Sequence, residues 1–227
     1  MSTAQRLRPD AEVDYPERDG RPMAEAPLHR DVIFLLIDIL RRWYAAAPEV
    51  YVSGNMMLYY EQGNPRRWVS PDVQVTLGIP REPERRVYKT WVEGKGPDLV
   101  IEVTSRSTQH EDEEWKFELY RRIGVTEYFL FDPERDYLDP PLQGYRLGNG
   151  EYEPIPAAEG RVPSNVLGLN LEADARSLRF FDPAAGRHLL SAQETISSAE
   201  AEITRLRKEL AALKQQVTPP SPEMQGQ

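Results

Sequence analysis

The alternation of hydrophobic and polar residues predicts one long helix followed by a series of strands. Residues 29–46 carry apolar side chains at helical spacing, and Pro27 and Pro48 bracket this segment. Shorter runs then alternate apolar with polar residues and are separated by turns rich in Gly, Pro and Asn. The clearest strand runs are residues 49–62, 68–79, 97–105 and 125–133.

The run at residues 97–105 leads into a helical segment that ends at Gly124, and the next strand run follows directly. A strand, a helix and a second strand in this order usually form a crossover that pairs the two strands in parallel. We therefore expect an α/β (α+β) domain with a mixed central β-sheet flanked by helices.

The C-terminal part has a different pattern, in which apolar residues recur at alternate spacings of three and four. These residues are Ile196, Ala199, Ile203, Leu206, Leu210, Leu213 and Val217. Such spacing is typical of a coiled coil. In a parallel pair, Glu202 would meet Arg207 of the second helix and Glu209 would meet Lys214, both with opposite charge. The pattern favours a parallel homodimer through residues 196–217; the alternative is an amphipathic helix folded back on its own domain.

The composition shifts along the chain divide it into four expected segments. These are a disordered N-terminus (1–14), a globular domain (15–190), a coiled-coil helix (191–217) and a disordered tail (218–227).

Composition and charge narrow the function classes. The absence of cysteine excludes disulfides, thiolate chemistry and Cys-ligated metal sites. No apolar run approaches the ~20 residues of a spanning helix, and no secretory signal is visible, so we expect a cytoplasmic protein with no membrane partner. The net charge of −9 argues against tight, sequence-independent binding to nucleic acid, because phosphate neutralisation dominates that affinity. Any binding to DNA would be weak, transient or assisted by metal.

Carboxylates on apolar strands are the main candidates for chemistry. Asp98 and Glu102 share one face of the same strand run, but roughly 13 Å of strand separates them, too far to chelate one ion easily. Asp72 enters a second apolar strand, and if the two strands are neighbours, Asp72 and Glu102 could hold one Mg²⁺ together with waters. Lys116, on the next helix, could then orient or deprotonate a water or stabilise a phosphate oxygen.

Each of these residues also has an ordinary structural explanation. A Pro-Asp pair is a common turn before a strand, and Glu102 could be a salt-bridged core acid. Lys116 could pair with Asp112 four residues earlier on a solvated helix face. Only the combination of an acid on each strand with a lysine on the next helix favours a functional site.

The runs "SPDVQV", "GPDLVIEVTSRST" and "YRRIGVTEYFLFDP", with a lysine-bearing helix between the last two, resemble the Uma-type (Uma-two) family of predicted restriction endonucleases. The family is placed in the PD-(D/E)XK nuclease superfamily, and the resemblance covers about residues 15–171. It implies a restriction-endonuclease-like core and a Mg²⁺-dependent phosphodiesterase site. By position, Asp72 is the motif aspartate and Glu102 the second acid. Thr104 stands where the family's usual lysine lies, so Lys116 would be a relocated lysine.

Three further residues have less definite expected roles. Asp98 belongs to the Pro-Asp signature of the family and is a candidate catalytic residue. Glu17, from the N-terminal segment, could be a further acidic metal ligand, a cap or a surface acid. His29 is expected to cap or pack at the start of the first helix.

The main hypothesis from the sequence is a Mg²⁺-dependent DNA endonuclease in which Asp72 and Glu102 hold the ion and Lys116 assists. The alternative is a catalytically inactive module of the same fold that regulates or scaffolds and dimerises through its coiled coil. A third possibility keeps the same site but acts on RNA or another phosphoester. Geometry discriminates between the first two: Asp72 and Glu102 converging in a cleft with Lys116 nearby would favour the nuclease. A Lys116 that points to solvent away from both acids would favour the inactive module.

Overall fold

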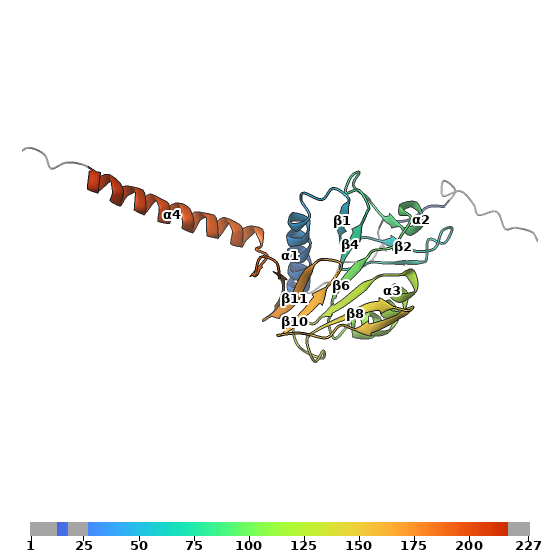
Figure 1. The fold of residues 1–227 in the computed structure, drawn as a ribbon. Coiled ribbons are helices and arrows are strands. Elements are labelled where there is room, and N and C mark those ends of the chain that lie inside the picture. The colour runs from blue at the N-terminus through green and yellow to red at the C-terminus, as the bar shows by residue number, and fades with distance from the viewer. Residues whose placement is uncertain (1–12, 18–26, 218–227) are drawn as a thin grey trace, which may run out of the picture. The chain divides into compact units, whose positions relative to one another are not determined.

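The computed structural model describes residues 13–17 and 27–217, which belong to two compact units, Met1–Leu189 and Leu190–Gln227 (Figure 1). The predicted disordered ends lie outside the described residues, apart from Val13 and Asp14. The first unit has the predicted mixed α/β architecture, and the second is the predicted C-terminal helix.

A six-stranded sheet forms the centre of the first unit. Its strands, in spatial order, are β1 (Val50–Ser53), β4 (Val73–Leu77), β6 (Leu99–Val103), β7 (Glu127–Phe131), β8 (Leu142–Gly148) and β9 (Glu151–Pro154). The pair β6–β7 is parallel and its neighbours are antiparallel, so the predicted strand–helix–strand crossover and the mixed sheet are confirmed.

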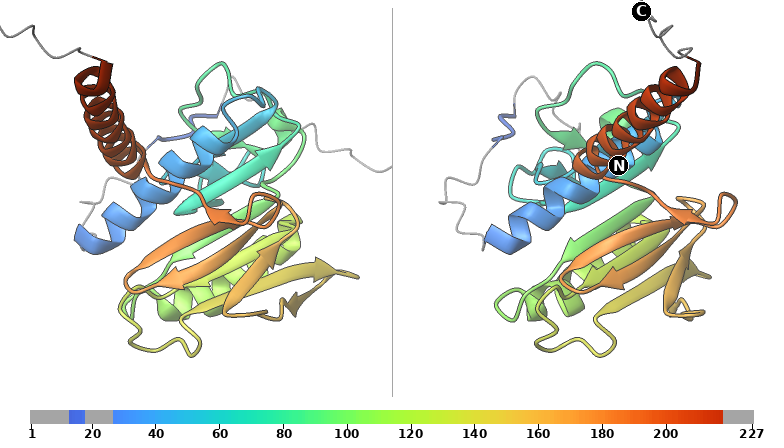
Figure 2. Two further views of the ribbon diagram at one scale, coloured as in Figure 1. Left: turned by 60° about the vertical axis from the view of Figure 1, so that its left-hand side comes forward. Right: turned by 90° about the vertical axis from the view of Figure 1, so that its left-hand side faces the viewer.

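Helix α1 (Pro27–Trp43) covers one face of this sheet, where Figure 2 shows it in blue. Its buried stripe follows the helical period and comprises Val32, Ile33, Leu36, Ile39 and Leu40. These side chains form one core with the residues of β6 that point to the same face, Leu99, Ile101 and Val103. A four-stranded antiparallel sheet adds to this core and consists of β10 (Arg161–Ser164), β11 (Leu169–Asp174), β12 (Ser177–Asp182) and β13 (Arg187–His188).

The other face of the central sheet is covered by the crossover helix. This helix begins with a turn of π-helix, η2 (Glu111–Lys116), and continues as α3 (Phe117–Ile123). Leu119 and Tyr120 of α3 pack against Val100 and Tyr128 in a second core. Because side chains alternate across a strand, Asp98, Val100 and Glu102 face this second core while their neighbours face α1.

A small third sheet stands beside the central one. It contains β3 (Trp68–Val69), β2 (Leu58–Tyr59) and β5 (Tyr88–Lys89), and the short helix α2 (Thr90–Glu93) follows it. The strand runs predicted at 49–62 and 68–79 are therefore each divided between two sheets. The chain leaves the central sheet after β1 and returns to it just before β4.

These two crossings pass very close to each other. The Asn55 amide donates to the carbonyl of Pro71 at 2.9 Å. A Cβ added to Gly54 would lie 2.0 Å from the carbonyl oxygen of Asp72 and 2.8 Å from a methyl carbon of Ile37. Only glycine permits this approach, and the approach places Asp72 at the entrance to β4.

The C-terminal unit is helix α4 (Ala192–Val217). It begins with a capping box, in which Ser191 Oγ accepts from the Glu194 amide at 3.1 Å and Glu194 Oε2 accepts from the Ser191 amide at 2.7 Å. Its apolar residues Ile196, Ile203, Leu206, Leu210 and Leu213 are each about half exposed. Within the part of the chain that the structure describes, no helix combines the length and the apolar character needed to span a bilayer.

The close approach at Gly54 generates a stability prediction. Replacing Gly54 with Ala should lower the free energy of unfolding by about 1–3 kcal/mol, because the backbone beside Asp72 must shift to admit a methyl group. The matched control is Gly148→Ala, where the nearest atom would lie 3.6 Å away, and a change below about 0.5 kcal/mol is expected there. Urea unfolding measures both values. Equal midpoints for Gly54→Ala and the parent would show that the packing is not needed.

Candidate active site

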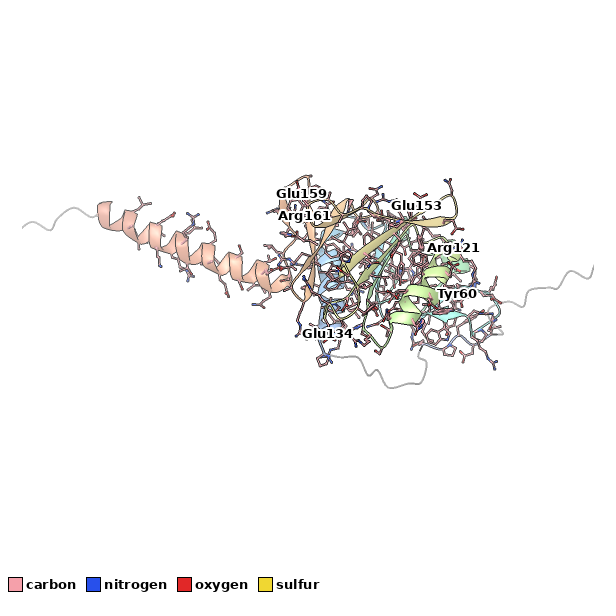
Figure 3. All side chains as sticks on the ribbon, turned by 90° about the horizontal axis from the view of Figure 1, so that it is seen from below. Tyr60, Arg121, Glu134, Glu153, Glu159 and Arg161 are labelled. Atoms are coloured by element: carbon pink, nitrogen blue, oxygen red, sulfur yellow. The ribbon has the colours of Figure 1, made fainter. Side chains whose placement is uncertain are left out.

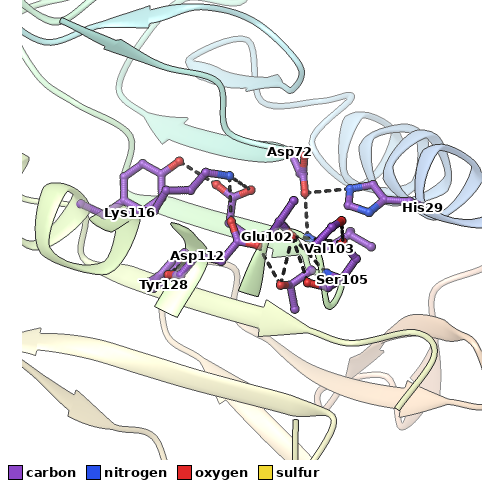
Figure 4. A network of polar contacts seen from close by, with 12 residues as sticks. His29, Asp72, Glu102, Val103, Ser105, Asp112, Lys116 and Tyr128 are labelled. Carbon is purple, nitrogen blue, oxygen red and sulfur yellow. Dashed lines mark hydrogen bonds and ion pairs between the residues drawn. The ribbon is translucent and has the colours of Figure 1, made fainter. Parts of the chain in front are cut away.

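The antiparallel pairing of β4 with β6 brings two acids together, one at the start of β4 and one near the C-terminal end of β6. The two strands are antiparallel neighbours with Val73 opposite Ile101. One residue further along this register, Asp72 stands opposite Glu102 on the same face of the sheet, where directly opposed residues have Cβ atoms about 4.5–5.5 Å apart. The neighbouring strands that a shared site requires are therefore present, and Figure 4 shows Asp72 and Glu102 among the residues of one polar network.

Asp72 is held by the backbone and by a histidine. Its Oδ2 accepts a hydrogen bond from the Val103 amide at 2.8 Å and lies 3.2 Å from Nε2 of His29 (Figure 4). His29 lies near the start of α1. This helix therefore contributes an imidazole to the site as well as apolar side chains to the core. The sequence predicts a capping or packing role for His29, and the structure adds a direct contact with Asp72 at the start of β4.

Glu102 is fully buried and uses both carboxylate oxygens. Oε2 accepts from Lys116 Nζ at 2.9 Å, and Oε1 accepts from the hydroxyl of Tyr120 at 2.6 Å. Lys116 Nζ also lies 2.9 Å from Asp112 Oδ1. The lysine side chain is only 11% exposed, so it points into the protein toward the acid on the strand.

The pair of Asp112 and Lys116 exists as the sequence indicates, but it is buried rather than solvated. Both residues belong to the π-helical turn η2, a geometry that often occurs at functional sites. The Tyr128 hydroxyl donates to the carbonyl oxygen of Asp112 at 2.9 Å and joins this turn to β7. The sequence pattern predicts a solvated helix face. That prediction describes other acids of this turn, such as Glu114, which is exposed.

Thr104, at the position of the family's usual lysine, supports Asp112. Its Oγ1 donates to Asp112 Oδ2 at 2.7 Å and also contacts the hydroxyl of Tyr137. The loop that carries Tyr137 is folded around the buried Asp132, whose carboxylate accepts from the amides of Glu134, Tyr137 and Leu138. Thr104 thus positions the acid that positions Lys116.

Asp98 and Glu17 lie apart from this cluster. Asp98 accepts from the Leu77 amide and from Lys95 Nζ, each at 2.7 Å, just before β6 begins and away from Glu102 at its other end. Glu17 pairs with Arg86 at 2.7 Å, where both side chains are largely exposed. Among the described residues no group of three His, Asp or Glu side chains forms a metal cluster, so neither acid joins Asp72 and Glu102.

The charges at the site are unbalanced. Burial raises the pKa of Glu102, the negative charges of Asp72 and Asp112 raise it further, and Lys116 opposes the rise. Burial would lower the pKa of Lys116, but the carboxylates of Glu102 and Asp112 outweigh it and raise that pKa above its ordinary value. The ammonium therefore stays charged. With all three acids ionised, negative charge remains in excess whether or not His29 is protonated.

This donor set fits a divalent cation. Mg²⁺ binds through one or two carboxylates and keeps several waters, so the opposed pair of Asp72 and Glu102 suffices. Each oxygen of Glu102 accepts one hydrogen bond and has a second lone pair, and both contacts of Asp72 described above involve Oδ2 and not Oδ1. A charge of +2 would also offset the excess negative charge that raises the pKa of Glu102.

Comparisons with known proteins agree with the fold described above. A crystal structure titled "a putative nuclease belonging to DUF820", from Anabaena variabilis ATCC 29413, superposes with a TM-score of 0.50 at 14% sequence identity. The match covers 73% of this chain and 93% of that one, and at this identity it shows a shared fold. No curated protein matches the sequence.

The family comparison covers most of the globular unit. The sequence profile described as "Uma2: Putative restriction endonuclease" matches residues 3–176, a span that contains every residue of the site described above. The resemblance seen in the sequence motifs is confirmed: this chain belongs to the Uma2 family, whose description is "Putative restriction endonuclease".

Proposed function

We propose that this protein is a metal-dependent endonuclease that hydrolyses phosphodiester bonds in DNA. The observation that carries the proposal is the meeting of Asp72 and Glu102 on adjacent strands with the Lys116 ammonium 2.9 Å from Glu102. Two acids that can hold a metal ion and a lysine that can offset phosphate charge suit metal-assisted phosphodiester hydrolysis. Family membership supports the same reaction.

Asp72 and Glu102 would hold Mg²⁺, which supplies an activated water and stabilises negative charge on the phosphate. The other residues orient these two acids. Tyr120 and Lys116 fix the two oxygens of Glu102, and the Val103 amide and His29 fix Asp72. The Lys116 ammonium also stands where it can offset charge on a phosphate oxygen.

The inactive-module alternative makes a different prediction for Lys116. In a domain without catalysis, nothing would require the buried pair of Glu102 and Lys116, since well-packed apolar residues of similar volume are often at least as stable. Lys116 lies beside Glu102 and Asp112 and not in solvent, which favours the nuclease. Assays on DNA and RNA distinguish the two substrates that share this chemistry.

Substituting the site residues tests the proposal. Asp72→Ala and Glu102→Ala should each abolish Mg²⁺-dependent cleavage, and Lys116→Met should slow it by about a hundredfold or more. The matched control is Glu114→Ala, which removes an exposed acid from the same helical turn and should leave the rate unchanged. Cleavage of labelled single- and double-stranded DNA with Mg²⁺ and with EDTA measures the rates. Full activity in either acid variant would refute the assignment.

The raised pKa of Glu102 predicts how stability depends on pH and metal. The folded state holds this proton more tightly than the unfolded state, so its contribution to stability is greatest at low pH and is lost as the pH rises through the folded pKa. In EDTA, the melting temperature of the parent should therefore fall relative to that of Glu102→Gln as the pH rises above the ordinary Glu pKa of about 4.3. Mg²⁺ should reduce this fall, because the cation replaces the proton. If the melting temperatures of the parent and of Glu102→Gln changed with pH in the same way, with and without Mg²⁺, the metal assignment would be contradicted.

We also propose that α4 forms a parallel two-stranded coiled coil, which would give one assembly two active sites. Its half-exposed apolar residues keep the heptad spacing. Arg205 pairs within the helix with Glu202 and Glu209 at 2.5–2.7 Å, while Arg207 and Lys214 are the residues that would meet those acids from a second helix.

Light scattering tests the dimer. Leu206→Glu with Leu210→Glu should yield a monomer, and the control Ala201→Glu, on the outer side of the helix, should not change the mass. Because the chain has no cysteine, a single Ile196→Cys substitution reports the relative direction of the two helices. A disulfide forms readily only when they run parallel and in register. A monomeric parent protein would refute the proposal.

A further inference from the structure

A cavity with a volume of about 530 Å³ lies outside the candidate active site. Its walls are the β2–β3 hairpin, the segment around α2 and the C-terminal end of α3. The side chains that matter for recognition are two aromatic residues and three cations: Tyr60, Trp91, Arg67, Lys95 and Arg122.

Two of these walls are formed by chain segments that also carry active-site residues. Arg122 lies six residues after Lys116 along η2 and α3, which at ~1.5 Å per residue is roughly 9 Å of helix. Arg67 lies five residues before Asp72, a span of at most about 17 Å of extended chain. Phosphates follow one another at ~3.4 Å per nucleotide along a duplex strand, so a strand cleaved at the site would have neighbouring nucleotides within reach of the cavity.

The cavity is positively charged in a protein of net charge −9. Lys95 is already paired with Asp98, so the two arginines carry the charge that a ligand would meet. Arg67 is 3.6 Å from Glu61, and both side chains are 54% exposed, an arrangement that contributes little to stability. An incoming phosphate can therefore compete for the guanidinium of Arg67, and it can join that of Arg122.

The aromatic residues supply a surface for a base. The guanidinium of Arg122 lies 5.8 Å from the centre of the Tyr60 ring. Figure 3 shows Tyr60 beside α3 and Arg121 on the same helix, where Arg121 is directed to Gly150 and Glu151 instead. A cationic groove lined by aromatic rings is the arrangement that binds unpaired nucleic acid, because any base can stack on a ring while the cations contact phosphates.

We propose that this cavity binds an unpaired nucleotide of the DNA strand next to the scissile bond. The base stacks on Tyr60, and Arg122 and Arg67 contact the adjoining phosphates. This inference rests on the proposed nuclease function for its substrate, but binding is measured separately from cleavage.

The test is fluorescence anisotropy of a labelled single-stranded 12-mer and the matching duplex, with the full chain in EDTA so that no cleavage occurs. Tyr60→Ala should weaken binding of the single strand by at least fivefold, since stacking contributes about 1–3 kcal/mol per base, or about 5- to 150-fold. Tyr60→Phe keeps the ring and should bind like the parent. The duplex, whose bases are already stacked, should be affected less.

Salt dependence separates a phosphate contact from a structural role. Arg122→Ala should lower the slope of log K against log salt by about 0.7, whereas Tyr60→Ala should leave the slope unchanged. Arg121→Ala removes the neighbouring arginine that points elsewhere and is the matched control. Equal affinity and slope for Arg122→Ala and the parent, or no binding of either oligonucleotide by the parent, would overturn the inference. Variants that bind weakly, together with a parent that binds DNA but never cleaves it, would instead refute the nuclease proposal and leave the nucleotide site standing.

Discussion

The antiparallel pairing of β4 with β6 is the constraint on which the candidate active site depends. It sets Asp72 opposite Glu102, and it also brings the Val103 amide to Asp72. A shift of one residue in this register would turn one acid toward the core under α1. Gly54 lets the backbone that follows β1 pack against the carbonyl of Asp72, and this packing helps to hold the same register.

The candidate active site also depends on the balance of buried charges around Glu102. A fully buried glutamate is tolerated because a lysine and a tyrosine contact its two oxygens, and the lysine is in turn shared with Asp112. Burial raises the pKa of Glu102, and the excess of negative charge from three acids around one ammonium raises it further. Such an excess costs stability in a purely structural network but suits a site that receives a divalent cation.

Strand periodicity and chain order were sufficient to predict the mixed sheet and the parallel crossover. They were also sufficient to single out Asp72 and Glu102 as acids on two apolar strands. Geometry along a single strand also separated Asp98 from Glu102 correctly, because that distance depends on one element alone. The burial of Asp112 and the contact of His29 with Asp72 were not predictable in the same way. Both depend on how α1, η2 and the loop carrying Tyr137 pack against the sheet, and a helical period says nothing about which acid on a helix meets a threonine on a strand. Glu17 was a candidate only by its charge, and its partner Arg86 is distant in sequence.

The placement of Lys116 on a separate helical turn has a consequence for regulation of the site by local motion. The two acids belong to the central sheet, which is the most protected part of such a domain, whereas the lysine is held by a short π-helical turn and a few side-chain contacts. Opening of residues 111–116 alone would withdraw the cation and leave the paired acids and the fold in place. Amide exchange in this turn, and not global stability, is then the quantity that should follow the fraction of molecules with an assembled site.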